Sequence, residues 1–106
     1  MAEKAQSARE FFEGAESRID PSKTRGFRAS YRFDVEGAGS WRVDVDDGAV
    51  RIEESDAPAD CVVRASEPTF LRIVNREGSP MTAFLTGKVR IEGDMGLLLK
   101  LREFLP

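Results

Sequence analysis

The side chains that most often carry out catalysis are scarce in this sequence. It contains no histidine, which is the commonest general base near neutral pH and the commonest metal ligand. Its one cysteine, Cys61, lies in a predicted strand with no histidine to activate it, so we interpret it as a buried structural thiol. The usual zinc sites need several such ligands and are excluded. We therefore predict no catalytic residue, no metal site and no cofactor, and we expect the protein not to be an enzyme.

The remaining candidates for chemistry have simpler interpretations. The segment Gly37-Ala38-Gly39 is too short for a phosphate-binding loop and is typical of a hairpin turn. Carboxylates are numerous, with 19 Asp and Glu against 16 Lys and Arg, but alternation along the predicted strands gives most of them partners of opposite charge. These charges are interspersed and sum to -3, and no basic block exists. This pattern argues against nucleic acid as a partner and against electrostatic docking to anionic lipid.

The first half of the chain shows a helix followed by three strands. Ser7 has capping-box spacing to Glu10, and the helical pattern that follows ends at Asp20-Pro21. A period of two then predicts strands over 27–36, 41–46 and 50–53. A two-residue loop at Asp47-Gly48 pairs Val45 with Val50 and Val43 with Ile52, and it pairs Asp44 with Arg51 on the other face.

A three-residue loop over Gly37–Gly39 extends this register to the first strand. It pairs Phe33 with Val43 and Tyr31 with Val45, and it places Asp34 opposite Arg42 and Arg32 opposite Asp44. One face of the sheet is then apolar, and the other is a pattern of compensating charges that we expect to be solvated.

The second half alternates between strands and helices. The pattern predicts a strand over 60–65, a helix capped by Ser66, a short helix over 81–85, a strand over 88–92 and a last helix capped by Asp94. At 106 residues we expect one domain over 1–106. Neither a signal peptide nor an apolar run of about 18 residues is visible, so we expect a cytoplasmic protein.

The last helix is more apolar than docking of one helix face requires. Between Met95 and Leu105 it carries five leucines, one methionine and one phenylalanine. These residues cover an arc of roughly 220°, whereas a surface helix needs little more than about 100°. Three explanations remain open: the helix is wedged between the sheet and other helices, it lines a cavity, or it forms an exposed patch for a partner or membrane.

The order of these segments resembles the sterol carrier protein 2 family. The resemblance rests on Gly87-Lys88-Val89-Arg90-Ile91-Glu92-Gly93-Asp94, which follows Met81-Thr82-Ala83-Phe84-Leu85 and precedes the leucine-rich helix. It implies an α+β fold of two layers, in which helices cover one face of a five-stranded, mostly antiparallel or mixed sheet with a hydrophobic cavity between the layers. It also implies carriage of fatty acids, fatty acyl-CoA, sterols or isoprenoid lipids without transforming them.

Apolar side chains on the helices and the sheet are the candidate lipid-binding residues, although plain core packing is an equally good explanation for each. They are Phe33, Trp41, Phe70, Ile73, Val74, Met81, Phe84, Leu85, Met95, Leu98, Leu99 and Leu101. For a polar head group the candidates are the amides of Gly96 and Leu97 and the hydroxyl of Tyr31. Against these, Asp94 would repel an anion, and Tyr31 could simply bond a buried carbonyl.

The rival interpretation is a protein-interaction or dimerisation module with a solid core. In that case the surplus leucines form a docking surface and no lipid is bound. The sequence is compatible with a monomer or a weak homodimer, and with transient membrane contact.

Overall fold

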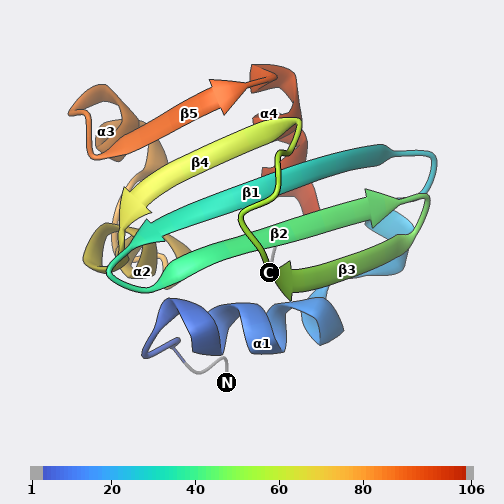
Figure 1. Cartoon of the computed structure of the whole chain (residues 1–106), viewed down its shortest axis with the longest axis horizontal. Helices are drawn as coiled ribbons and strands as arrows, with labels where there is room; N and C mark the ends of the chain where they lie inside the picture. Colours follow the sequence, from blue (N-terminus) through green and yellow to red (C-terminus); the bar gives the residue numbers. More distant parts are fainter. Residues whose placement is uncertain (1–3, 105–106) are drawn as a thin grey trace.

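The computed structural model describes residues 4–104, which form one five-stranded sheet and the helices that cover it (Figure 1). The strand order is β3-β2-β1-β4-β5; β1 and β4 are parallel, and the other neighbours are antiparallel. The predicted α+β fold with a mixed sheet is confirmed. The elements, in chain order, are α1 (Ala8–Arg18), the 3-10 helix η1 (Pro21–Lys23), β1 (Arg28–Glu36), β2 (Gly39–Asp46), β3 (Ala49–Glu54), β4 (Cys61–Ser66), α2 (Glu67–Val74), α3 (Pro80–Leu85), β5 (Val89–Gly93) and α4 (Met95–Phe104).

Short polar side chains start the helices where the sequence predicts them. Ser7 accepts a hydrogen bond from the amide of Glu10, Ser66 from that of Thr69, and Ser79 from that of Thr82. Each of these oxygens satisfies a backbone donor that has no partner within its own helix.

The register of the β2–β3 hairpin is confirmed. Val45 pairs with Val50, Val43 with Ile52, and Asp44 with Arg51. Asp47 and Gly48 form its turn, both with positive φ, as a tight two-residue hairpin loop requires.

The predicted register of the β1–β2 hairpin is wrong by one loop position. The loop spans Glu36–Ala38, so Tyr31 pairs with Val43, Phe33 with Trp41, and Arg32 with Arg42. The Ala38 amide donates to the Val35 carbonyl, which puts Gly37, at φ 90°, in the third position of the turn. This displacement changes the register by two residues, so every side chain stays on its predicted face while the cross-strand partners change.

The charges of this region pair along the strands as a consequence. Arg32 contacts Asp34 at 2.9 Å, and Arg42 contacts Asp44 two residues away at 2.5 Å. Asp34 also accepts from Ser40 and from Arg64 on β4. The charges of β1 and β2 on this face therefore compensate one another, although through different pairs from those predicted.

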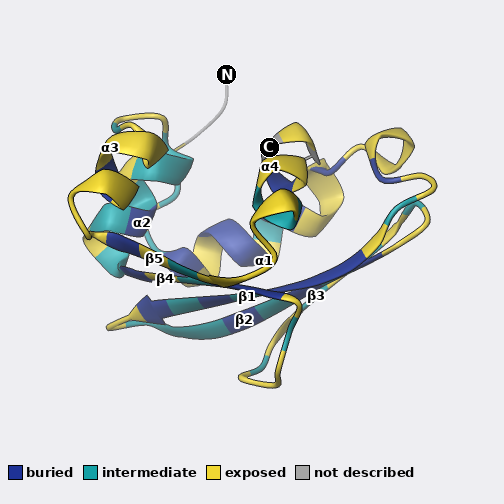
Figure 2. Ribbon diagram, turned by 90° about the horizontal axis from the view of Figure 1, so that it is seen from above, coloured by how far each residue is buried: buried dark blue, intermediate teal, exposed yellow. Residues whose placement is uncertain are grey.

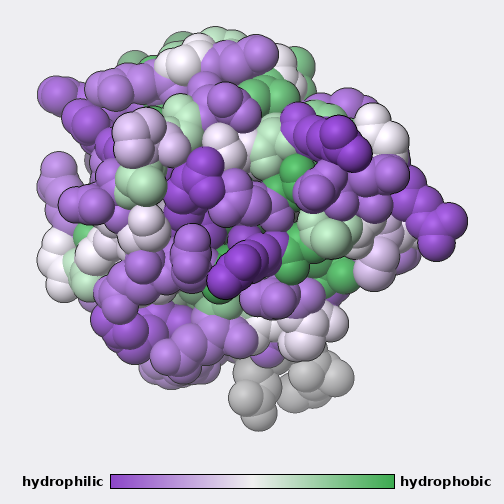
Figure 3. All heavy atoms as spheres, turned by 45° about the vertical axis from the view of Figure 1, so that its right-hand side comes forward, coloured by the Kyte–Doolittle hydropathy of each residue, from purple (hydrophilic) through white to green (hydrophobic). Residues whose placement is uncertain are grey.

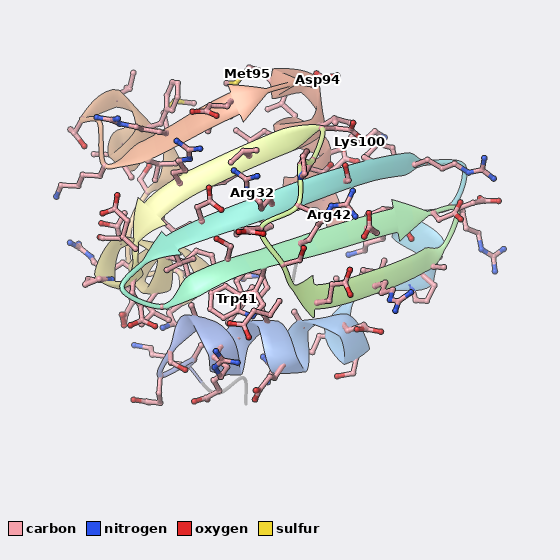
Figure 4. The ribbon with its side chains drawn as sticks, viewed as in Figure 1. Arg32, Trp41, Arg42, Asp94, Met95 and Lys100 are labelled. Atoms are coloured by element: carbon pink, nitrogen blue, oxygen red, sulfur yellow. The ribbon has the colours of Figure 1, made fainter. Side chains whose placement is uncertain are left out.

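All four α-helices lie on one face of the sheet, and the β3–β4 connection crosses the other face (Figure 2). Arg32 donates to the carbonyl of Asp56, and Arg42 to that of Pro58, so the connection is held down on the charged face, which we call the open face (Figure 4). The carboxylate of Asp60 accepts from the Ser30 amide at its far end.

Two glycines fix the ends of β5. Gly87, at φ 77°, follows α3 in a backbone conformation that other residues rarely adopt. At Gly93 an added Cβ would lie 2.2 Å from the carbonyl oxygen of Asp60, much closer than packing allows. The amide of Asp94 donates to that same oxygen, so the end of β5 lies directly against the start of β4.

In residues 4–104, no helix combines the length and the apolar character that a membrane span requires.

Candidate functional site

Three of the predicted lipid-binding residues belong to a tightly filled aromatic cluster. The cluster consists of Phe11, Phe12, Phe33, Trp41 and Phe70. Phe12 stacks on Trp41, with ring centroids 5.0 Å apart, and on Phe70 at 5.4 Å. Phe33 lies 5.3 Å from the Phe12 ring. All five side chains are buried. Much of the surface of Phe33, Trp41 and Phe70 is thus in contact with other aromatic rings of the protein.

Helix α4 is anchored to the sheet by one apolar and one polar contact. Leu101 is buried and packs into the core. Tyr31 is fully buried, and its hydroxyl donates to the main-chain carbonyl of Leu97 at 2.6 Å. Burial raises the pKa of Tyr31 above its ordinary value, and electrostatic repulsion from Cys61, Asp94 and Asp60 raises it further. Leu105 and the side chain of Phe104 lie outside the described part of the chain.

The exposed apolar side chains gather on two helices. Among the described residues, the large hydrophobic side chains that are exposed to solvent are Met81, Phe84 and Leu85 on α3 and Met95 and Leu99 on α4. Leu85 and Leu99 are 74% and 65% exposed, although both were candidate ligand contacts on sequence grounds. We call these five residues the apolar rim. The face of the molecule that Figure 3 shows is mostly hydrophilic, with small groups of hydrophobic side chains.

Helices α3 and α4 stand apart over the edge of the sheet formed by β4 and β5 (Figure 2). Val63 and Ile91 pair across β4 and β5 and share the helix-covered face with Ala65 and Val89, yet both remain only half-buried. Ile73, Val74, Leu97 and Leu98 are also half-buried against the core. Val63 and Ile91 therefore form an incompletely covered apolar floor on β4 and β5, the strands that α4 and α3 contact. The alternation of these strands could have identified both residues from the sequence, but neither is among the predicted lipid-binding residues.

The predicted head-group position is occupied by the chain's own carboxylate. Asp94 Oδ1 accepts from the Gly96 amide at 2.8 Å, and the Asp94 carbonyl lies 3.2 Å from the Leu97 amide. Both amides and the Tyr31 hydroxyl therefore have partners within the protein. Figure 4 shows Asp94 and Met95 together at the start of α4, at the edge of the sheet.

A polar depression lies at the opposite end of β5. It has a volume of about 530 Å³ and is lined by Glu36, Arg64, Ala65, Ser66, Thr69, Gly87, Lys88 and Arg90. We call it the cationic hollow, because three of its side chains are basic and one is acidic.

The described residues offer little for acid–base or metal chemistry. Cys61 is fully buried, and burial raises the pKa of its thiol, so the reactive thiolate is disfavoured. In residues 4–104 no three Cys, Asp or Glu side chains are grouped closely enough to hold a metal ion. The arrangement is suited to binding by apolar contact.

Comparison with known proteins places the chain in a family. The family model described as the SCP-2 sterol transfer family matches residues 9–106. The chain belongs to the SCP-2 sterol transfer family. The resemblance seen in the sequence is thereby confirmed.

Several of the proteins to which the chain is similar are much longer than it is. Hydroxysteroid dehydrogenase-like protein 2 of Xenopus laevis is 31% identical over 105 residues, which are 95% of this chain and 25% of the relative. The chain thus spans about a quarter of the length of the curated relatives it matches first. A double mutant of the sec-alkyl sulfatase PisA1 superposes with a TM-score of 0.84 at 23% identity, over 96% of this chain and 17% of that one. The solution structure of palmitated SCP2L2 from Aedes aegypti superposes with a TM-score of 0.72 at 24% identity, over 92% and 93% of the two chains.

Proposed function

We propose that the protein binds lipids or other hydrophobic small molecules without covalent chemistry and carries them without transforming them. Fatty acids, fatty acyl-CoA, sterols and isoprenoid lipids are the ligand class. The observation that carries the proposal is the apolar rim, because the described large hydrophobic side chains that are exposed all lie on α3 and α4, the helices that contact the strands of the half-covered apolar floor. Membership of the SCP-2 sterol transfer family and the palmitated relative of the same fold support it.

The proposed site lies between α3 and α4, over Val63 and Ile91. Removing an acyl chain from water stabilises the complex by about 0.8 kcal/mol per buried methylene. A dozen methylenes would supply on the order of 10 kcal/mol before the costs of association are subtracted. Met81 and Met95 have flexible, polarisable side chains that adapt to ligands of different shape. Such contacts carry no hydrogen-bond pattern, so we infer that ligand specificity is broad.

The same observation supports a second candidate. An exposed apolar patch is also typical of a protein–protein contact, so the apolar rim could instead pair with a second copy of the chain. In that case the floor would be covered by the partner and no lipid would be taken up.

Native mass spectrometry of freshly purified protein, combined with displacement of a fluorescent fatty acid, separates the two candidates. We expect a monomer carrying one lipid, and we expect Leu85→Glu to weaken fatty-acid binding at least about tenfold, because it places a charge beside the hydrocarbon chain. The control is Ala49→Glu, which adds the same charge at an exposed position on β3, far from the apolar rim in the sheet order.

Two outcomes would contradict the proposal. One is a lipid-free protein that leaves the fluorescent fatty acid unbound. The other is a dimer that Leu85→Glu converts to a monomer, with no lipid bound in either state, which would support the interaction module.

A further inference from the structure

The cationic hollow brings together basic residues that are dispersed in the sequence. Arg64 lies in β4, whereas Lys88 immediately precedes β5 and Arg90 lies within it. The hollow is lined by three basic side chains and one carboxylate, that of Glu36. Its positive charge contrasts with the net charge of -3 of the whole chain. The fold therefore gathers positive charge that is interspersed with negative charge along the sequence.

The pairing of β4 with β5 sets two of these cations against each other. Arg64 and Arg90 are direct cross-strand partners. Their neighbours in sequence, Val63 and Ala65 on β4 and Val89 and Ile91 on β5, face the helices, so both arginines project from the open face. Like charges directly opposite one another destabilise an antiparallel pair.

Only one of the two arginines is compensated by the protein. Arg64 contacts Asp34 at 3.1 Å and Glu92 at 3.3 Å. Within the described part of the chain, neither Lys88 nor Arg90 forms an ion pair. An anion in the hollow would supply the missing charge and would relieve the repulsion between Arg64 and Arg90.

The other residues that line the hollow indicate which class of anion it can bind. The hydroxyl of Thr69 lies in the wall; it accepts a hydrogen bond from the Ser66 hydroxyl at 3.1 Å and can donate its own proton to a ligand. Guanidinium groups present several donors in a plane and recognise phosphate oxygens in pairs. A volume of about 530 Å³ exceeds what one carboxylate needs and accommodates a larger phosphate-bearing group.

We propose that the cationic hollow binds a phosphate-bearing group through Arg90, Lys88 and Arg64. The hollow adjoins the end of α3, because Gly87 and Lys88 line it and Leu85 of the apolar rim precedes them by two residues. A phosphate attached to the lipid of the apolar site is one source of this group, and this part of the inference rests on the proposed function. A soluble phosphate compound is the other source.

Titration with inorganic pyrophosphate, followed by heteronuclear amide spectra of the full chain, tests the hollow by itself. We expect saturable shifts at Gly87, Lys88 and Arg90 that weaken as salt is added. We expect Arg90→Gln to reduce the affinity about tenfold, since it removes a charge-assisted contact. The control is Arg51→Gln, which removes an exposed arginine from the open face of the opposite edge strand, β3, and should leave the affinity unchanged.

Displacement of a fluorescent fatty acid by hexadecyl phosphate and by hexadecanol then distinguishes the two sources. If the phosphate belongs to the lipid, hexadecyl phosphate competes more strongly than hexadecanol, and Arg90→Gln removes that advantage. If the phosphate is soluble, the two compounds compete equally and pyrophosphate still binds.

The absence of saturable shifts at the hollow, or equal pyrophosphate affinity in Arg90→Gln and the unmodified chain, would overturn the inference. Hexadecanol binding without pyrophosphate binding would refute the hollow alone. Pyrophosphate binding without uptake of either hexadecyl compound would refute the proposed function alone.

Discussion

The two halves of the helical layer differ in how far their large apolar side chains are buried. Under α1 and α2 the aromatic cluster is closed, with Phe12 stacked between Trp41 and Phe70. Around α3 and α4, by contrast, five large apolar side chains remain exposed over a half-buried floor. A chain of this size needs one well-packed core for stability, and the first half supplies it. The second half can therefore leave apolar surface uncovered, as the proposed lipid site requires.

Phe12→Ala should have the largest effect on stability and tests whether the aromatic cluster is the more tightly packed of the two regions. The ring contacts four other aromatic residues, and its removal leaves a cavity in a filled region. We expect a loss of about 3–5 kcal/mol in the free energy of unfolding, measured by urea denaturation. Leu85→Ala, in the other half, should change it by less than about 0.5 kcal/mol. Similar losses in the two variants would mean that the halves do not differ in the way described.

Tyr31→Phe tests how strongly helix α4 is held against the sheet. It removes the hydrogen bond to the Leu97 carbonyl, and we expect a loss of about 1–2 kcal/mol at neutral pH. The pKa of Tyr31 is raised in the folded protein, so the unfolded chain ionises first and stability falls as pH rises above the ordinary tyrosine value of 10.0.

The slope from this group approaches about 1.4 kcal/mol per pH unit between the unfolded and folded pKa values. Denaturant melts across that pH range should show a shallower decline for Tyr31→Phe than for the unmodified chain. Part of the decline will persist, because burial also raises the pKa of Cys61. Identical slopes in the two chains would argue against the buried hydroxyl.

Asp34→Asn is expected to have a smaller effect than Tyr31→Phe and probes the open face of the sheet. Burial by itself would raise the pKa of this carboxyl, but hydrogen bonds from Arg32, Ser40 and Arg64 outweigh it and lower the pKa. The stabilisation is therefore present above the unfolded value of 3.8 and is lost as pH falls through the lower folded value. We expect a loss of about 1 kcal/mol at neutral pH and a flatter acid limb in chemical denaturation. An unchanged acid limb would mean that these contacts are not maintained in solution.

Local patterns in the sequence were sufficient for the elements and for most of the sheet. Capping residues, glycines and alternation predicted each helix and strand, because these signals act over a few neighbouring residues. The β1–β2 register could not be settled in this way. A three-residue loop can be placed on Glu36–Ala38 or on Gly37–Gly39 while every side chain keeps its face.

The candidate site was predicted less completely, for a related reason. Periodicity shows that a side chain is apolar and on which face it lies, but not whether another element covers it. Trp41 and Leu85 looked equivalent in the sequence, yet one is buried by α1 and the other is largely exposed. The cationic hollow is a property of strand pairing, since Arg64 and Arg90 are far apart in the chain.

Gly93 links the half of the molecule that carries the apolar rim to the open face of the sheet. Any side chain there would collide with Asp60, which anchors the connection on the open face and receives the amide of Asp94. Substitution would push the first turn of α4 outward and would move Met95 with it. Under the proposed function, the rim residues of α3 and α4 can vary with the ligand, whereas position 93 must remain a glycine.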